Sequence, residues 1–252
     1  MGKKPIPKIG LKADANYFDW HTDLGYNVME IGSRDHDFKF KIPTILKTKD
    51  FLKGKEISMH TQTSRIFSCK EQGLPEFNEA ELRILEAEII LCKVLEIKEL
   101  IFHLKVGKLD EGETKILKKL LKFAKKNNVE LIFESNSEVI AENTLDVLSK
   151  FPKLGYNLDL GHINVGINSG KFGMSLEEFL SRVKNRIIYI HAHNNNGLKD
   201  EHKSLDQGTL DWKHVLDQLN FKKIRKIIME VRTKEEADTT KRLLEDYFKT
   251  RN

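Results

Sequence analysis

The stretch from His191 to Gly208 concentrates residues that can bind a metal ion. It begins directly after the apolar run 187–190, which is typical of a buried strand. Its possible ligands are His191, His193, Asp200 and His202. Imidazole and carboxylate together suit zinc or a similar divalent ion. A strand that ends in a ligand-rich loop is how a parallel α/β barrel builds its active face, so the other strand ends should carry similar residues.

Six predicted strands end in a potential ligand, and the loops just beyond them add three more. The strand ends are His60, His103, Glu134, Asp159, His191 and Glu230, and the loop residues are His162, Asp200 and His202. Any one of them could be a hydrogen-bonded core histidine or a carboxylate paired with a lysine. Strand ends of a barrel converge on one mouth, however, so all nine should become neighbours there. Together they predict a metal site.

The elements that must position these side chains form eight strand–helix units at near-even spacing, without a linker. Strands are expected at 8–11, 28–31, 57–59, 100–102, 129–133, 155–158, 187–190 and 227–229. Helices are expected at 14–24, 44–52, 76–95, 113–127, 138–150 and 234–248, and from Ser175 and Asp211, with a Gly/Asn loop at 161–173. The pattern predicts the α/β class and a single (β/α)8 TIM barrel domain over residues 1–252.

Composition restricts the class of protein further. With 39% hydrophobic and 32% charged residues the chain should be globular, and its two cysteines are too few for a disulfide framework. Residues 1–5 lack the apolar core of a signal peptide, and no apolar stretch is long enough for a bilayer, so we expect a cytoplasmic protein without a membrane partner. As a separate expectation, we take the protein to be a monomer. A formal charge of +5 permits a polyanionic partner but does not require one, and a solvated Lys- and Glu-rich surface explains the charge better.

The number of ligands also carries information. One divalent ion is satisfied by four protein ligands or fewer, so nine predict two or three ions. Paired metal ions are common in phosphodiester hydrolysis, because they activate a water molecule and stabilise the leaving oxygen.

In the order of these nine ligand residues, the chain resembles the endonuclease IV family of apurinic/apyrimidinic endonucleases, in the xylose isomerase-like superfamily. The resemblance extends from about Ile9 to Lys249. The resemblance implies three zinc ions, with Mn²⁺ as the alternative. The first would bind His60, His103 and Glu134. The second would share Glu134 and add Asp159, His191 and Glu230. The third would bind His162, Asp200 and His202.

The reaction implied by this resemblance is cleavage of double-stranded DNA 5′ to an abasic site. A hydroxide held between the first two ions would attack the phosphodiester, with Glu134, Glu230 and His103 as the catalytic ligands. The expected DNA contacts are Arg34, Arg65, Ile66, Phe67 and Arg232. Arg34 would fill the space that the abasic nucleotide leaves, and Ile66 or Phe67 stands where the family places an aromatic side chain. His193 stands where the family usually carries Asn.

A second hypothesis comes from the same superfamily. Sugar and sugar-phosphate isomerases and epimerases are similar to this chain in Asp200 and His202 followed by residues 205–212. They need one metal ion, here on Glu134, Asp159, His191 and Glu230, with two carboxylates moving a proton beside a carbonyl. Arg232 would then bind a sugar oxygen or phosphate. A metal-stabilised scaffold without chemistry is the third alternative.

Overall fold

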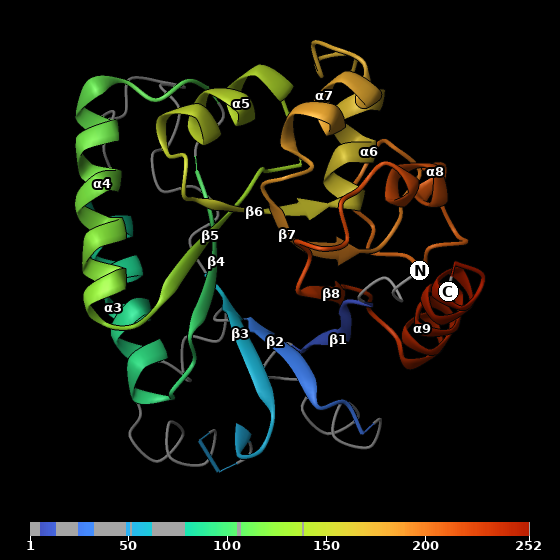
Figure 1. The fold of residues 1–252 in the computed structure, drawn as a ribbon, viewed down its shortest axis with the longest axis horizontal. Coiled ribbons are helices and arrows are strands. Elements are labelled where there is room, and N and C mark those ends of the chain that lie inside the picture. The colour runs from blue at the N-terminus through green and yellow to red at the C-terminus, as the bar shows by residue number, and fades with distance from the viewer. Residues whose placement is uncertain are drawn as a thin grey trace. The chain divides into compact units, whose positions relative to one another are not determined.

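The computed structural model describes residues 6–13, 25–32, 49–50, 52–61, 79–104, 107–137 and 139–251. Its eight strands follow one another in chain order around a closed parallel barrel, with helices between them (Figure 1). This confirms the predicted (β/α)8 class. The helix expected at 14–24 and most of that at 44–52 fall outside the described residues. No helix in the described part of the chain combines the length and the apolar character needed to cross a membrane.

All eight predicted strands are present, with ends that differ slightly from those expected. The strands are β1 (Lys8–Ala13), β2 (Val28–Gly32), β3 (Glu56–His60), β4 (Glu99–His103), β5 (Glu130–Glu134), β6 (Gly155–Asp159), β7 (Ile187–Ala192) and β8 (Lys226–Met229). The helices are α3 (Glu79–Val94), α4 (Glu111–Lys126), α5 (Ala141–Lys150), α6 (Leu160–Asn168), α7 (Leu176–Val183), α8 (Trp212–Asp217) and α9 (Lys234–Lys249).

The chain divides into two compact units, one formed by Met1–Leu11 with Ser135–Asn252 and the other by Lys12–Glu134. We refer to them as the C-terminal unit and the N-terminal unit. The expectation of a single domain over residues 1–252 stays a prediction.

The N-terminal unit contains β2 to β5, which pair in parallel. Their sequences are nearly continuous apolar runs because both faces of such strands are covered, and Met59 and Phe102 are fully buried. In the β4–β5 register His103 pairs with Glu134, so two of the expected ligands leave the sheet side by side. Helices α3 and α4 lie next to each other in this unit (Figure 1).

Residues close in sequence determine where helix α4 begins and ends. Asp110 caps its first turn by accepting from the Glu113 N–H, and the Glu113 carboxylate accepts from the Asp110 N–H. At the other end Asn128 adopts a positive φ of 61°, a conformation that asparagine tolerates after a helix C-terminus. These signals involve neighbours in the chain, so they can be recognised without the fold.

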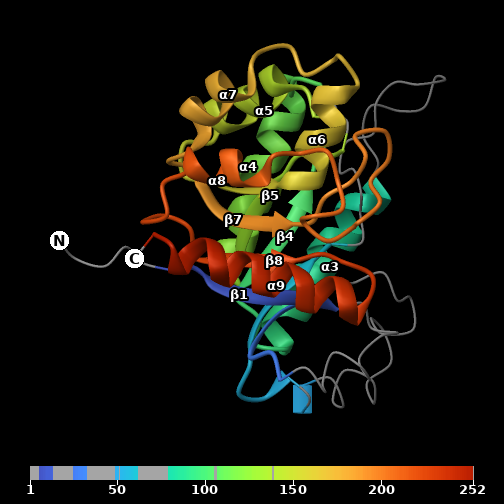
Figure 2. The ribbon, with the colours of Figure 1, turned by 90° about the vertical axis from the view of Figure 1, so that its right-hand side faces the viewer.

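The C-terminal unit contains β6, β7 and β8 in parallel register, together with residues Lys8 to Leu11 of β1. Asp159 at the end of β6 pairs with His191 on β7, which again brings two expected ligands together. Helix α9 runs beside β8 (Figure 2) and opens with a capping box between Thr233 and Glu236.

The loop expected at 161–173 is wrong, because residues 160–168 form α6. Gly161 and Gly166 suggested a loop, but both have a packing role instead. A Cβ atom on Gly161 would lie 2.0 Å from the His193 ring, and one on Gly166 would lie 3.0 Å from Val139. Asp159 caps the helix by accepting from the His162 N–H at 2.7 Å.

Candidate metal centre

In the N-terminal unit, three strand ends bring together His60, His103 and Glu134, all of them buried. The Nε2 atoms of the two histidines lie 3.2 Å apart, and the two Glu134 oxygens lie 3.5 and 3.6 Å from them. Zinc binds such ligands at about 2.0–2.2 Å, so ligand atoms of one tetrahedral ion are separated by about 3.4 Å. The three side chains therefore fit a single divalent ion without rearrangement.

The His60 tautomer suits this role. Its Nδ1 atom lies 3.0 Å from the Thr61 carbonyl oxygen and donates to it, which leaves Nε2 as the unprotonated, metal-binding atom. Thr61 is itself held, since its hydroxyl donates to the buried carboxylate of Glu88 on α3. The backbone of β3 thus presents His60 in a fixed orientation.

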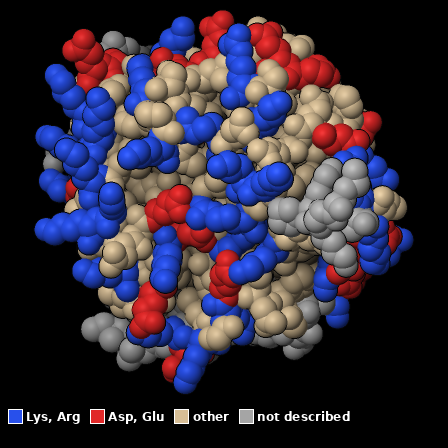
Figure 3. All heavy atoms as spheres, viewed as in Figure 1, with Lys and Arg blue, Asp and Glu red and all other residues tan. Residues whose placement is uncertain are grey.

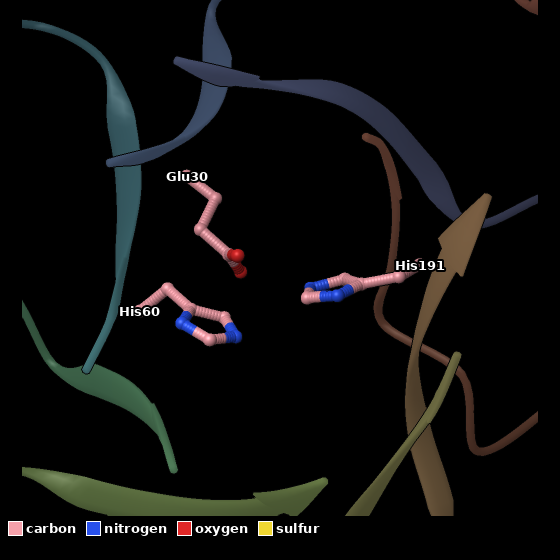
Figure 4. A group of neighbouring side chains, drawn as sticks. All are labelled: Glu30, His60 and His191. Atoms are coloured by element: carbon pink, nitrogen blue, oxygen red, sulfur yellow. The ribbon is translucent and has the colours of Figure 1, made fainter. Parts of the chain in front are cut away.

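Glu30 is a buried acidic residue that the sequence-based ligand set omitted. It lies in the middle of β2, accepts a hydrogen bond from Ser58 at 3.4 Å and lies 3.7 Å from the Lys12 ammonium group. A Glu30 oxygen is within 4.8 Å of a His60 ring nitrogen, and Figure 4 shows both polar ends directed toward the same point. The available signal was a carboxylate within the apolar run Val28–Ile31, which is costly to bury alone.

In the C-terminal unit a second group is formed by Asp159, His191 and Glu230. The His191 ring extends from β7 (Figure 4), and its Nδ1 atom lies 2.9 Å from Glu230 Oε2 and 3.5 Å from Asp159 Oδ2. Burial by itself would raise the pKa of the Asp159 carboxyl, but the surrounding imidazoles outweigh burial and hold that pKa well below its ordinary value. Asp159 is therefore ionised, as a metal ligand must be.

The loop residues His162, Asp200 and His202 gather in the same unit. Asp200 Oδ2 lies 3.3 Å from His162 Nε2 and 3.2 Å from His202 Nε2. Burial acts to raise the pKa of Asp200, but its bonds to these two histidines lower it overall. The expected third set of ligands is thus brought together by the fold.

His193 lies among these ligands, although the family resemblance left it out. It is fully buried, with Nε2 3.0 Å from Asp159 Oδ1 and Nδ1 3.6 Å from Asp200 Oδ1. Its ring stacks on that of His202, with centroids 4.5 Å apart. The sequence placed it in a ligand-rich loop but could not show that it faces two carboxylates.

Buried asparagines hold the loop that carries Asp200 and His202. The side-chain nitrogen (Nδ2) of Asn164 on α6 lies 2.8–2.9 Å from three acceptors. It donates to the backbone carbonyl and side-chain oxygens of Asn195 and to the Thr209 hydroxyl. The side-chain nitrogen of Asn194 donates to the carbonyl oxygens of Leu205 and Leu210, while its backbone pairs with that of Lys203. The loop is therefore fixed from both of its ends.

Most of the expected DNA contacts cannot be placed. Arg34, Arg65, Ile66 and Phe67 lie outside the described residues. Arg232 is exposed, and its backbone N–H donates to Glu236 at the start of α9. Its role toward DNA or a sugar stays a prediction.

Basic side chains gather elsewhere on the surface. Figure 3 shows Lys and Arg residues over the edge that α4 occupies. The exposed lysines of this helix are Lys115, Lys118, Lys119, Lys122, Lys125 and Lys126. They lie opposite the buried positions of an amphipathic helix, which is typical of a solvated outer face.

The expected ligands therefore fall into one group within the N-terminal unit and a larger one within the C-terminal unit. Each group contains enough imidazole and carboxylate for a divalent ion. The expectation that Glu134 bridges two ions stays a prediction.

Comparison with protein families gives a match over nearly the whole chain. Residues 18–250 match the family described as "Xylose isomerase-like TIM barrel". Two curated relatives match shorter segments, each covering 46% of this chain. One is an uncharacterised protein of Methanocaldococcus jannaschii, 32% identical over 116 residues. The other is a probable cobalt-precorrin-6B C(15)-methyltransferase (decarboxylating) of Methanococcus maripaludis, 31% identical over 117 residues. The matches span only 38% and 61% of those proteins.

Solved structures share the fold at low sequence identity. A D-tagatose 3-epimerase-like protein is 19% identical with a TM-score of 0.77, covering 96% of this chain and 97% of its own. A zinc-soaked protein from Thermus thermophilus is 17% identical with a TM-score of 0.72, covering 95% and 97%. The IOLI protein with a bound zinc atom is 14% identical with a TM-score of 0.71, covering 97% and 99%.

Proposed function

Because the chain belongs to the xylose isomerase-like TIM barrel family, we propose that it is a metal-dependent enzyme that isomerises or epimerises a sugar or a sugar phosphate. The observation that carries the proposal is the convergence of Asp159, His191 and Glu230 within one unit. Several solved structures that share this chain's fold are sugar 3-epimerases or resemble them, which favours this reaction over phosphodiester hydrolysis.

In this reaction Asp159, His191 and Glu230 would hold one divalent ion. The ion would bind oxygens of the substrate and make the C–H bond beside its carbonyl group more acidic. Asp159 stays ionised because the neighbouring imidazoles lower its pKa, so it serves as a permanent ligand. His191 is fully buried, and its Nδ1 atom faces both carboxylates.

Glu230 is the carboxylate in this group that a substrate can reach. Its side chain is 17% exposed, whereas that of Asp159 is 1% exposed. A carboxylate beside the carbon that loses its proton can accept that proton and return it to the neighbouring atom or the opposite face. We therefore assign proton transfer to Glu230, and the sequence-based expectation adds Glu134 as the second carboxylate.

Hydrolysis of DNA 5′ to an abasic site is the second candidate. It is favoured by His60, His103 and Glu134, whose geometry fits a further ion. A one-metal isomerase does not need the two histidines of this group. A hydrolase that holds hydroxide between two ions does need them.

One experiment separates the two reactions. Metal-loaded protein is incubated with a panel of ketoses and ketose phosphates and with a duplex containing one abasic site, each with and without chelator. The proposal expects chelator-sensitive conversion of a ketose substrate and an intact duplex. Cleavage of the duplex together with no sugar conversion would replace the proposal by the hydrolase hypothesis.

A variant sharpens the comparison. His103→Ala should leave sugar conversion within about tenfold of the wild type, because the residue lies outside the ligand set of the proposed ion. The same substitution should abolish hydrolysis if the first ion holds the nucleophile. His214→Ala is the matched control, since His214 is an exposed histidine on α8 that pairs with Glu177.

A further inference from the structure

Three histidines lie around Asp200. Each has one ring nitrogen near the Asp200 carboxylate, while its other ring nitrogen hydrogen-bonds to a different group. His162 Nδ1 lies 2.8 Å from the Ser135 carbonyl oxygen, and His202 Nδ1 lies 3.2 Å from the Glu230 carbonyl oxygen. Carbonyl oxygens only accept, so both Nδ1 atoms carry the proton. In the neutral rings, the Nε2 atoms that face Asp200 then have a lone pair available for a cation.

His193 repeats this arrangement with its nitrogens exchanged. Its Nε2 atom lies 3.0–3.1 Å from the carboxylate oxygens of Asp159, and an ionised carboxylate only accepts. Nε2 therefore carries a proton, and in the neutral ring Nδ1 has a lone pair available for a cation. A histidine that donates to a carboxylate through one nitrogen and binds metal through the other is a common ligand arrangement.

The Nδ1 atom of His193 lies beside a second carboxylate, that of Asp200. Nδ1 of His193 and Oδ1 of Asp200 are buried, lie 3.6 Å apart, and have no hydrogen-bond partner among the residues that the structure describes. In the neutral ring Nδ1 accepts, as the carboxylate oxygen does, so the two atoms cannot satisfy each other, and burying both without a partner is costly. Their separation is close to the distance of about 3.4 Å between two ligand atoms of a tetrahedral zinc ion. A cation between them would satisfy both atoms.

We infer that His193 is the fourth protein ligand of a divalent ion bound by His162, Asp200 and His202. The donor atoms would be Nδ1 of His193, Nε2 of the other two histidines and the Asp200 carboxylate. One ligand atom from each of His193, Asp200 and His202 can be chosen so that all three lie within 4.8 Å of one another. The resemblance to endonuclease IV assigned only three ligands to this ion and left His193 out.

The fourth ligand changes what the ion does. Three protein ligands leave one position for water or substrate, whereas four close a tetrahedral site. A closed site is structural, so this ion fastens the loop carrying Asp200 and His202 to Asp159 and α6. The inference is independent of which reaction the protein catalyses.

A crystal structure of the zinc-loaded wild-type protein tests the ligand set directly. Anomalous difference density at the zinc edge should show an ion about 2.0–2.1 Å from His193 Nδ1. A peak bonded by the other three residues, with His193 Nδ1 out of reach, would overturn the inference. So would the absence of a peak at Asp200.

A solution experiment uses cobalt(II), which absorbs visible light much more strongly in tetrahedral than in five- or six-coordinate sites. His193→Asn should remove one tetrahedral cobalt per chain from the spectrum. It should also lower the affinity for that cobalt ion. The loss should exceed the roughly 10–100-fold that follows removal of a residue that only hydrogen-bonds to a metal ligand. His214→Asn, at an exposed histidine, should change neither quantity. An unchanged tetrahedral spectrum in a folded His193→Asn protein would contradict the inference, and the wild-type crystal decides if that variant does not fold.

Discussion

Gly161 and His193 are in direct contact, since a Cβ atom built on Gly161 would lie 2.0 Å from Cε1 of the imidazole ring. The first turn of α6 and the histidine that faces Asp159 and Asp200 therefore occupy complementary space. Only glycine permits this approach. The position of the helix and the orientation of the candidate ligand are set together.

Gly161→Ala should destabilise the protein, because the new methyl group must displace the His193 ring or the α6 backbone. Overpacking of this kind lowers the free energy of unfolding by about 1–3 kcal/mol. Urea denaturation of the metal-free protein measures it. Gly112→Ala is the control, since Gly112 lies in α4, where the nearest atom to a new Cβ is Asp110 Oδ1 at 3.3 Å. Equal losses in the two variants would contradict the steric explanation.

Asn164→Asp should loosen the loop that carries Asp200 and His202. The substitution preserves size but replaces the nitrogen that donates to Asn195 and Thr209 with an acceptor. We expect a loss of about 1–3 kcal/mol in the free energy of unfolding, as for other buried groups left unsatisfied. Hydrogen exchange of amides in residues 194–210 should increase as well.

The matched control for that loop is Asn220→Asp. Asn220 also donates through its side-chain nitrogen, to Asn185, but it does so at the surface. Exposed substitutions usually change stability by less than about 0.5 kcal/mol. If both variants behaved alike, the buried network would not be what holds the loop.

Arg186→Lys should weaken the end of α5. The guanidinium group of Arg186 donates to the carbonyl oxygens of Leu148, Phe151 and Leu154. A lysine ammonium group cannot reproduce this planar fork, so at least one buried carbonyl should lose its partner, at a cost of about 1–3 kcal/mol. Thermal and urea denaturation measure the change. Arg182→Lys, which affects only a surface pair with Glu178, should be nearly neutral.

Cys92 should make stability depend on alkaline pH. Burial, with a smaller effect of Glu88, raises the pKa of its thiol well above the ordinary value. A raised pKa in the folded state means that the stabilisation is present below the unfolded pKa of about 8.5 and is lost as pH rises beyond it.

Urea denaturation of wild type and Cys92→Ala between pH 7.5 and 10 tests this pH dependence, where about 8.5 is the unfolded reference. The stability advantage of the wild type should shrink by up to about 1.4 kcal/mol for each pH unit above that value. A difference that stays constant over the range would mean that the thiol ionises equally well in the folded protein.

Much of the fold could be predicted from the sequence, because its signals are local. Apolar runs predicted all eight strands, and the helix starts expected at Ser175 and Asp211 are confirmed, since each side chain accepts from a backbone N–H within the first turn. The ligands at strand ends could also be predicted, since parallel strands of a barrel bring their carboxyl ends to one face. Glycines led to a wrong prediction at α6, where their role is packing against residues distant in sequence.

The tertiary structure decided which of these residues act together. The residue type made His193 a possible ligand, but only the strand register and the buried asparagine network placed its ring between Asp159 and Asp200. Glu30 likewise became a possible metal ligand only when the fold placed its carboxylate beside Ser58 and His60. A sequence gives residue types and local periodicity, whereas the direction of a lone pair and the burial of its partner depend on packing between elements far apart in the chain.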